Sequence, residues 1–410
     1  MRRSLRAAVA TSAVAAVAFG SLLAAPAAMA AGNIVFWTDA DRAPAVRTLF
    51  ANGYMGSTVT VVVKDFGKIR DDLATVTPDA APDVIMGAND WVGELAVNGS
   101  IVKLNLATKA KAGLSAGAVQ AFNYNGKQYG TPVAVENIAL ITNASLVKTQ
   151  PKTFQELSTQ ALALKKAGKV EIPLAVQQGA GGDAYHMYPM FTGLGGYIFG
   201  TTAKGAYDVK NIGVFNKVFA ANASIIDGWN KSGLINSKVT GDIATAAFTS
   251  GKAPFWITGP WNLDKIKAVG FKYRISAVPP IIPGTDAVPF IGSQGVMLTK
   301  FAATHGVEAA ARSLVSEFMA GEKAQYQLSA LNDRFPANTA AAARVSNAQL
   351  KAFGLAGKGG VPIPNVAQMN AVWGPLGAAW VNSTKGAGAM PAAKAFAQAQ
   401  VAIKKAVAAG

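Results

Sequence analysis

Four carboxylates and one arginine lie where strand-like stretches of the sequence end: Asp41, Arg42, Asp90, Glu136 and Asp183. Packing seldom needs a charge at the end of a strand, and open α/β sheets bind ligands outside the carboxyl ends of their strands. Charged groups at that edge can hydrogen-bond the neighbouring hydroxyl groups of a ligand. We therefore expect these side chains to bind a polar ligand, with solvent-exposed strand ends as the alternative.

Large aromatic residues lie close to glycine or proline in polar surroundings: Trp91, Tyr185, Trp261 and Trp373. Each alone could belong to a core. Flat aromatic faces also cover the apolar C–H face of a pyranose ring, while carboxylates and arginine take its hydroxyl groups. The combination is typical of carbohydrate recognition. Asn89, beside Asp90, is a further candidate ligand-binding residue, as is Trp91.

The elements that must position these residues alternate between strands and helices. Strand-like runs cover 33–37, 58–63 and 82–86, with helical stretches between them, which predicts a parallel α/β sheet. Asn125-Gly126 is a strong turn signal, and the strand after it ends on Glu136. We expect Glu136 to face the ligand where the chain passes between two lobes.

Later segments are mostly helical. Thr153 and Glu156 form a capping box at the start of a helix. Residues 279–289, rich in proline, are expected to be a crossing segment. Further helices are predicted over 307–320, 339–355 and 391–408.

The N-terminus has a basic start, an apolar alanine-rich run and an Ala-Met-Ala site, which together predict a signal peptide over residues 1–30, cut after Ala30. A membrane anchor is the alternative, which Pro26 argues against. We expect a periplasmic, extracellular or envelope-associated protein. The absence of cysteine from the 410 residues excludes disulfides, thiolate metal sites and a lipid anchor on cysteine. With only two histidines, we expect no metal and no cofactor.

The remaining 380 residues suggest two or more domains. The predicted signal peptide contributes three arginines and no acid, which leaves +13 of the formal charge of +16. Such an excess suggests an acidic neighbour. Because the lysines are scattered singly, we expect no nucleic-acid partner, and attraction to the envelope or simple solubility is favoured.

From about residue 33 to 400, the chain resembles the maltose/maltodextrin-binding proteins, the extracellular solute receptors of bacterial ABC sugar importers. The similar motifs follow one another in order along the chain. They are Phe36-Trp37 before Asp41-Arg42, Ala81 to Ile85 before Asp90, Tyr124 to Glu136, Pro151 to Phe154, Gly195-Gly196-Tyr197 after Tyr185, Gly205 to Val209, Gly259-Pro260-Trp261, and Gln368 to Trp373.

The resemblance implies an α/β periplasmic-binding-protein fold, with two lobes of discontinuous segments, a hinge between them and the ligand in the cleft. The N-terminal lobe would comprise 31–134 plus 289–332, and the C-terminal lobe 135–288 plus 333–410. Asp41, Arg42, Asp90, Glu136 and Asp183 would bind sugar hydroxyl groups, and Tyr185, Trp261 and Trp373 would stack on the sugar rings.

Four positions depart from the family pattern. Gly87 replaces a frequent tryptophan, Trp91 and Gly377 each replace an arginine, and Asp183 is shorter than the usual glutamate. These differences put the preferred length and linkage of the sugar in question. Trp91 could compensate for the ring that is missing at position 87.

The resemblance implies a receptor without catalytic activity, a monomer that captures maltodextrin-type α-glucan oligosaccharides and delivers them to the membrane permease of an ABC importer. One alternative is a receptor for another neutral sugar, such as trehalose, sucrose or a cyclodextrin. A more distant alternative is a secreted glycoside hydrolase, which would need two carboxyl groups about 5–10 Å apart.

Overall fold

The computed structural model describes residues 32–409, so the predicted signal peptide lies outside the described residues. In this part of the chain no helix combines the length and the apolar character that crossing a membrane requires.

The larger sheet has seven strands in the order β14-β6-β13-β3-β1-β2, with β15 paired to β13. Strand β1 is parallel to both of its neighbours, whereas β13 is antiparallel to β3 and β6. The predicted strand–helix alternation is thus confirmed for the first three strands. The strand bounds are β1 Asn33–Thr38, β2 Thr58–Val63, β3 Val84–Ala88, β6 Thr131–Glu136, β13 Phe290–Leu298, β14 Phe335–Pro336 and β15 Val361–Pro362.

A second sheet has four strands in the order β12-β7-β11-β8. Two hairpins, β4–β5 and β9–β10, complete the strand pairing. In the first of them, Asn125 and Gly126 both have positive φ (49° and 74°), as the turn signal predicted. The bounds are β4 Asn123–Tyr124, β5 Lys127–Gln128, β7 Ala139–Asn143, β8 Ala175–Val176, β9 Phe199–Thr201, β10 Tyr207–Ile212, β11 Phe255–Thr258 and β12 Tyr273–Ser276.

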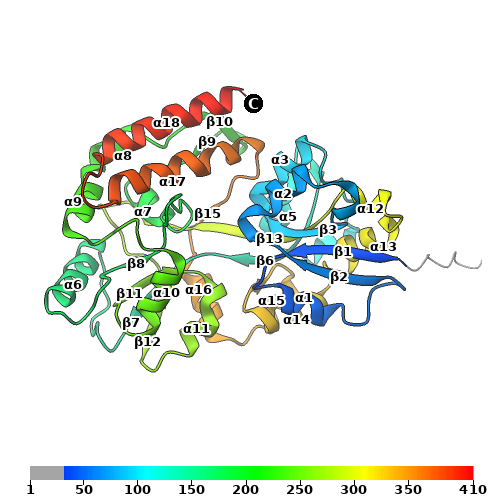
Figure 1. Ribbon diagram of the computed structural model, residues 1–410, viewed down its shortest axis with the longest axis horizontal. Coiled ribbons are helices and arrows are strands. Elements are labelled where there is room, and N and C mark those ends of the chain that lie inside the picture. The colour runs from blue at the N-terminus through cyan, green and yellow to red at the C-terminus, as the bar shows by residue number, and fades with distance from the viewer. Residues whose placement is uncertain (1–31, 410) are drawn as a thin grey trace, which may run out of the picture.

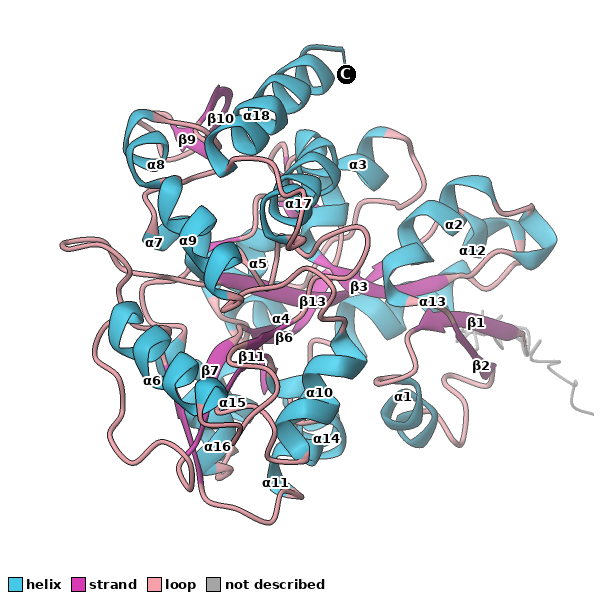
Figure 2. Ribbon diagram, turned by 60° about the vertical axis from the view of Figure 1, so that its left-hand side comes forward, coloured by secondary structure: helices cyan, strands magenta, loops and turns pink. Residues whose placement is uncertain are grey.

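Helices pack around each sheet (Figures 1 and 2). Around the larger sheet lie α1 Ala43–Leu49, α2 Ile69–Thr75, α3 Val92–Val97, α4 Thr108–Ala112, α5 Ala116–Ala121, α12 Phe301–Thr304, α13 Glu308–Ser313, the π-helical turn Leu314–Phe318, α14 Glu322–Asn332 and α15 Thr339–Arg344. Around the second sheet and beside it lie α6 Phe154–Lys166, α7 Tyr188–Gly193, α8 Lys217–Asn222, α9 Ser224–Ser232, α10 Gly241–Thr249, α11 Leu263–Lys267, α16 Ala348–Ala356, α17 Asn370–Thr384 and α18 Ala392–Ala409.

Two groups of elements with separate apolar cores therefore form two lobes, and strands β6 and β13 run between them in Figure 1. The chain crosses between the lobes after β6, before β13 and after β14. This mixed α/β architecture confirms the predicted two-lobe fold. The division into 31–134 plus 289–332 and 135–288 plus 333–410 stays a prediction.

The predicted capping box is present at the start of α6. Thr153 Oγ1 accepts the backbone N–H of Glu156 at 3.1 Å, and Glu156 Oε2 accepts the backbone N–H of Lys152 at 2.7 Å. The side-chain acceptors satisfy two backbone donors near the helix start, which would otherwise have no intrahelical partner.

Helix α17 packs directly on the glycine-rich loop that follows β8. Gly182 has φ +75°, and a Cβ atom built on it would lie 2.1 Å from the carbonyl oxygen of Gly377. A Cβ on Gly377 would lie 2.7 Å from the carbonyl oxygen of Gly181. Because backbone meets backbone here, no arginine fits at position 377 without moving the loop.

Substitution of Gly377 by alanine should destabilise the protein by about 1–3 kcal/mol, since the new methyl group collides with backbone that cannot turn away. Gly374, in the same helix, has open space around it. Its replacement by alanine should stabilise the helix by about 0.5–1 kcal/mol. Denaturant unfolding of both variants measures the two effects. A stabilising Gly377→Ala substitution would contradict the close packing.

Candidate functional site

Glu136, at the end of β6, is the centre of a buried polar cluster. Its Oε1 accepts a hydrogen bond from Gln294 Nε2 at 2.8 Å, and its Oε2 lies 2.9 Å from Arg334 Nε. Arg42 Nη2 lies 3.8 Å from Oε1. All four residues are buried, and a buried charge is tolerated only when it is paired and hydrogen-bonded. The cluster joins three strand ends of the larger sheet, β1, β6 and β14, with the middle of β13.

Arg42 also pairs with Asp39, the first residue after β1. Asp39 Oδ1 accepts the backbone N–H groups of Asp41 and Arg42, at 3.0 and 3.2 Å. Burial acts to raise the pKa of Asp39, but the guanidinium of Arg42 holds it below the usual value. Asp41 is exposed. Asp39 rather than Asp41 is therefore the carboxylate that fixes Arg42 in the site.

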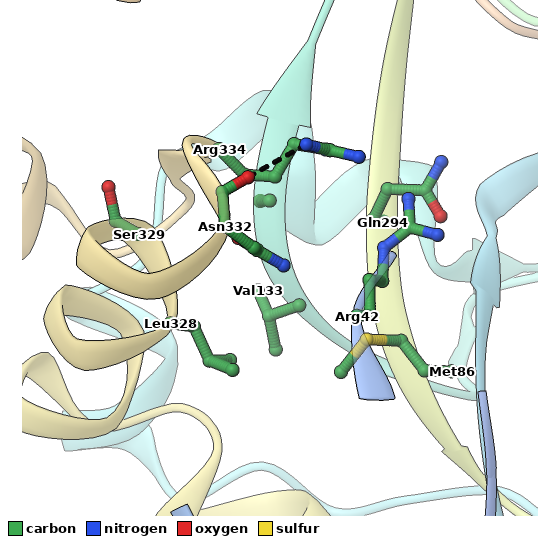
Figure 3. A pocket seen from close by; sticks show the side chains of 9 residues that line it. Arg42, Met86, Val133, Gln294, Leu328, Ser329, Asn332 and Arg334 are labelled. Atoms are coloured by element: carbon green, nitrogen blue, oxygen red, sulfur yellow. Dashed lines mark hydrogen bonds between the residues drawn. The ribbon is translucent and has the colours of Figure 1, made fainter. Parts of the chain in front are cut away.

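The two carboxylates Asp39 and Glu136 balance the two guanidinium groups of Arg42 and Arg334. Figure 3 shows both arginines extending toward Gln294 across a small cavity, with Met86 and Val133 below. The cavity measures about 10 Å³, which is close to the space that one water molecule needs. The cluster as a whole carries no net charge, so it suits a neutral ligand with many hydrogen-bonding groups.

Of the three predicted aromatic residues, Trp261 lies against this cluster with Tyr185 beside it, whereas Trp373 contacts Asp90. The guanidinium carbon of Arg334 lies 5.8 Å from the ring centre of Trp261, and the Tyr185 ring lies 6.1 Å from Trp261. Phe290 stacks on Tyr185, with ring planes 16° apart, and meets Trp373 edge-on. The structure thus brings Tyr185, Trp261 and Trp373 together with charged residues at the edge of the larger sheet.

The electrostatic environment of Tyr185 shows the same convergence. Burial raises the pKa of its hydroxyl group well above the ordinary value, and the negative charges of Glu136, Asp183 and Asp90 raise it further. These carboxylates come from both lobes, so Tyr185 lies at their meeting point.

Asp90 and Trp373 form a direct contact between the lobes. The indole Nε1–H of Trp373 donates a hydrogen bond to Asp90 Oδ2 at 3.0 Å. Burial raises the pKa of Asp90 to about 6, although this hydrogen bond and Arg70 act to lower it. Part of the Asp90 population is therefore protonated in mildly acidic solution.

The other two candidates near Asp90 are held by the protein itself. The side-chain amide of Asn89 donates to the carbonyl oxygen of Ile363 at 2.9 Å and accepts the backbone N–H of Ser293 at 3.0 Å. The ring of Trp91 fills the space that a side chain on Gly87 would occupy. Trp91 is buried in an apolar cluster of the first lobe, where it packs on Phe66, and its role in ligand binding stays a prediction.

Asp183, in the loop after β8, is bound to its neighbours at both carboxylate oxygens. Oδ1 accepts the backbone N–H of His186 at 2.9 Å, whereas Oδ2 is 2.8 Å from His186 Nδ1 and 2.7 Å from Gln177 Nε2. Burial acts to raise the pKa of Asp183, but His186 and Gln177 hold it below the usual value. Asp183 is thus an ionised carboxylate in the site.

Reasoning from the sequence missed four residues of this site: Asp39, His186, Gln294 and Arg334. Asp39, like Asp41, follows the first strand, so the position of a carboxylate at a strand end could have identified it as well. Gln294 is a polar residue inside an apolar strand, which could have singled it out. Residues 32–409 contain no group of three histidine, aspartate or glutamate side chains that could hold a metal ion.

Replacement of Asp90 by asparagine tests the raised pKa. The asparagine keeps an acceptor for Trp373 but carries no charge. Because the folded-state pKa of Asp90 is raised, its contribution to stability is complete below about pH 4 and is lost as the pH rises through 6. The unfolding free energy of the variant, relative to that of the wild type, should therefore rise by up to about 3 kcal/mol between pH 4 and pH 7.5. Unfolding free energies across this range measure the gain, and a difference that does not change with pH would contradict it.

Comparison with known proteins identifies the family of the chain. The model of the bacterial extracellular solute-binding protein family matches residues 45–354. A galactooligosaccharide-binding protein of Bacillus subtilis is 26% identical over 359 residues, which cover 85% of this chain and 83% of that protein. A maltooligosaccharide ABC transporter solute-binding lipoprotein of Streptococcus pneumoniae is 29% identical over 309 residues, 72% of this chain and 69% of that protein.

A maltodextrin-binding protein of Bacillus subtilis is 29% identical over 334 residues, which cover 77% of this chain and 76% of that protein. The family and these relatives are binding proteins rather than enzymes, which confirms the prediction of a receptor and leaves the glycoside hydrolase alternative without support. The chain belongs to the bacterial extracellular solute-binding protein family.

Proposed function

We propose that the protein captures an α-glucan oligosaccharide of the maltodextrin type and delivers it to the permease of an ABC importer. The observation that carries this proposal is the meeting of Trp261 and Tyr185 with a charge-balanced cluster around Glu136, next to the contact of Trp373 with Asp90. Aromatic faces bind the C–H faces of glucosyl rings, and the charged groups bind their hydroxyl rims.

The balance of charge supports a neutral sugar. Within the Glu136 cluster, Asp39 and Glu136 compensate Arg42 and Arg334, so this cluster has no excess charge that would call for an ion as the ligand. Asp90 and Trp373 are held to each other, so either can exchange that hydrogen bond for one to a sugar hydroxyl group.

The contacts between the lobes suggest how binding is signalled. Trp373 meets Asp90, and Trp261 lies beside Arg334, so a sugar in this place touches both lobes at once. A ligand that binds both lobes favours the arrangement in which they are joined. The permease would recognise that arrangement, and no covalent chemistry is required of the receptor.

A galactooligosaccharide is the second candidate ligand, because a relative that matches 85% of this chain is named for binding it. Maltooligosaccharide and maltodextrin name other relatives. The packed position Gly377 and the ring of Trp91 over Gly87 are where the site departs from the maltodextrin pattern, so they bear on this choice.

We further propose that the protein acts outside the cytoplasmic membrane as a monomer, after removal of residues 1–30. The family is extracellular. The cysteine-free sequence offers no thiol for a lipid anchor, so the protein would be periplasmic, released, or held at the envelope by its positive charge.

Calorimetric titration with maltotriose, maltoheptaose, a cyclodextrin, trehalose, sucrose and a galactooligosaccharide tests the ligand. We expect binding of the linear α-glucans, and Trp261→Ala should weaken it by at least about tenfold, because a stacking face is lost. Tyr326→Ala removes an aromatic residue that packs on Arg344 in another part of the molecule, and should leave the affinity unchanged.

If the protein binds no α-glucan but binds the galactooligosaccharide, the galactooligosaccharide replaces maltodextrin as the proposed ligand. Release of shorter sugars from maltoheptaose, seen on a chromatogram, would contradict the receptor role itself.

A further inference from the structure

Two adjacent residues of the site each have a buried polar atom without a hydrogen-bond partner in the described part of the chain. These atoms are the hydroxyl group of Tyr185 and the Nε2 of His186. His186 itself is only 5% exposed. Buried polar atoms are nearly always hydrogen-bonded, so an exception inside a candidate binding site is an atom that a ligand or a water molecule can satisfy. Glu136 Oε2, Gln294 Oε1 and Arg334 Nε in the neighbouring cluster are further exceptions.

The protein holds the imidazole of His186 in a fixed orientation. Asp183 contacts both its backbone N–H and its Nδ1, and Gln177 holds the same carboxylate from the other side. A carboxylate at 2.8 Å from Nδ1 places a proton on that nitrogen. In the neutral ring Nε2 is then an acceptor, ready for an O–H group.

This nitrogen lies beside the aromatic residues that are proposed to stack on the sugar. The His186 ring is 5.6 Å from Trp261 and 5.5 Å from Tyr185, centre to centre, with ring planes at 83° and 75°. A sugar that lies flat on an aromatic face points its hydroxyl groups sideways from its rim. A ring that stands perpendicular to that face is suited to meet them.

We propose that His186 is a further ligand-binding residue, whose Nε2 accepts a hydrogen bond from a hydroxyl group of the sugar unit held by Trp261 and Tyr185. This inference rests on the proposed function. It also changes the part given to Asp183, whose two oxygens are already engaged by His186 and Gln177. Asp183 is then a positioning residue, and its short side chain is what brings the carboxylate to His186 rather than to the sugar.

The experiment compares His186→Phe with His186→Gln in the full mature protein. Phenylalanine keeps the ring and removes Nε2, so the affinity for maltotriose should fall about tenfold, the usual effect of one lost hydrogen bond. The side-chain carbonyl of glutamine can reach the place of Nε2, so that variant should bind within about threefold of the wild type. Thermal unfolding of each variant establishes that the fold is kept.

Wild-type affinity in His186→Phe would overturn the inference, and so would an equal loss in both variants, since a merely structural histidine gives no rescue by glutamine. In both cases the wild type still binds the sugar and the proposed function stands. A wild-type protein that binds no sugar of the panel would overturn the proposed function, and this inference with it.

Discussion

The site depends on the burial of one carboxylate, that of Glu136. A lone buried carboxylate is costly, and pairing offsets that cost only when the geometry is good and the other lone pairs are satisfied. Here Gln294 and Arg334 approach the two oxygens, and Arg42 lies at the edge of ion-pair distance. These partners come from β13, from the residue before β14 and from the residue before α1, so the ionised group requires all three segments to be in place.

The same requirement organises what surrounds the cluster. Arg334 reaches Glu136 with its Nε and lies over Trp261, which belongs to the other lobe. Asp39 completes the pairing of Arg42. The charges at the edge of the larger sheet are thus arranged before any ligand arrives, which reduces the cost of ordering them on binding. Trp261 therefore packs against an arginine whose position is already fixed by Glu136.

Local signals in the sequence predicted the local structure well. The turn at Asn125-Gly126, the cap at Thr153 and the strand that ends on Glu136 each depend on residues within a few positions. Strand ends also pointed to one edge of the sheet, where Arg42, Asp90 and Glu136 are all buried; their role in binding a sugar stays a prediction. At β1 the turn geometry, which the sequence does not reveal, decides that Asp39 faces inward and Asp41 outward.

The residues that the sequence did not reveal act through distant partners. Gln294 lies 158 positions from Glu136, and no periodic pattern links two such residues. The orientation of His186 depends on the loop that places the Asp183 carboxylate against its ring. The departure at Gly377 was visible in the sequence, but its cause, the contact with the loop at Gly182, needed the packing of α17.

Strand β13 lies between β3 and β6 in the larger sheet, although it follows them by more than 150 residues. The gap that it fills is therefore open until the ribosome has made residue 298. Until then, the backbone N–H and C=O groups of β3 and β6 that face this gap have no partner strand. Such exposed strand edges can pair with another chain. Pairings so distant in sequence also form slowly. Completion of this sheet is thus a late event in synthesis, because nearly three quarters of the chain must exist before β13 can pair with β3 and β6.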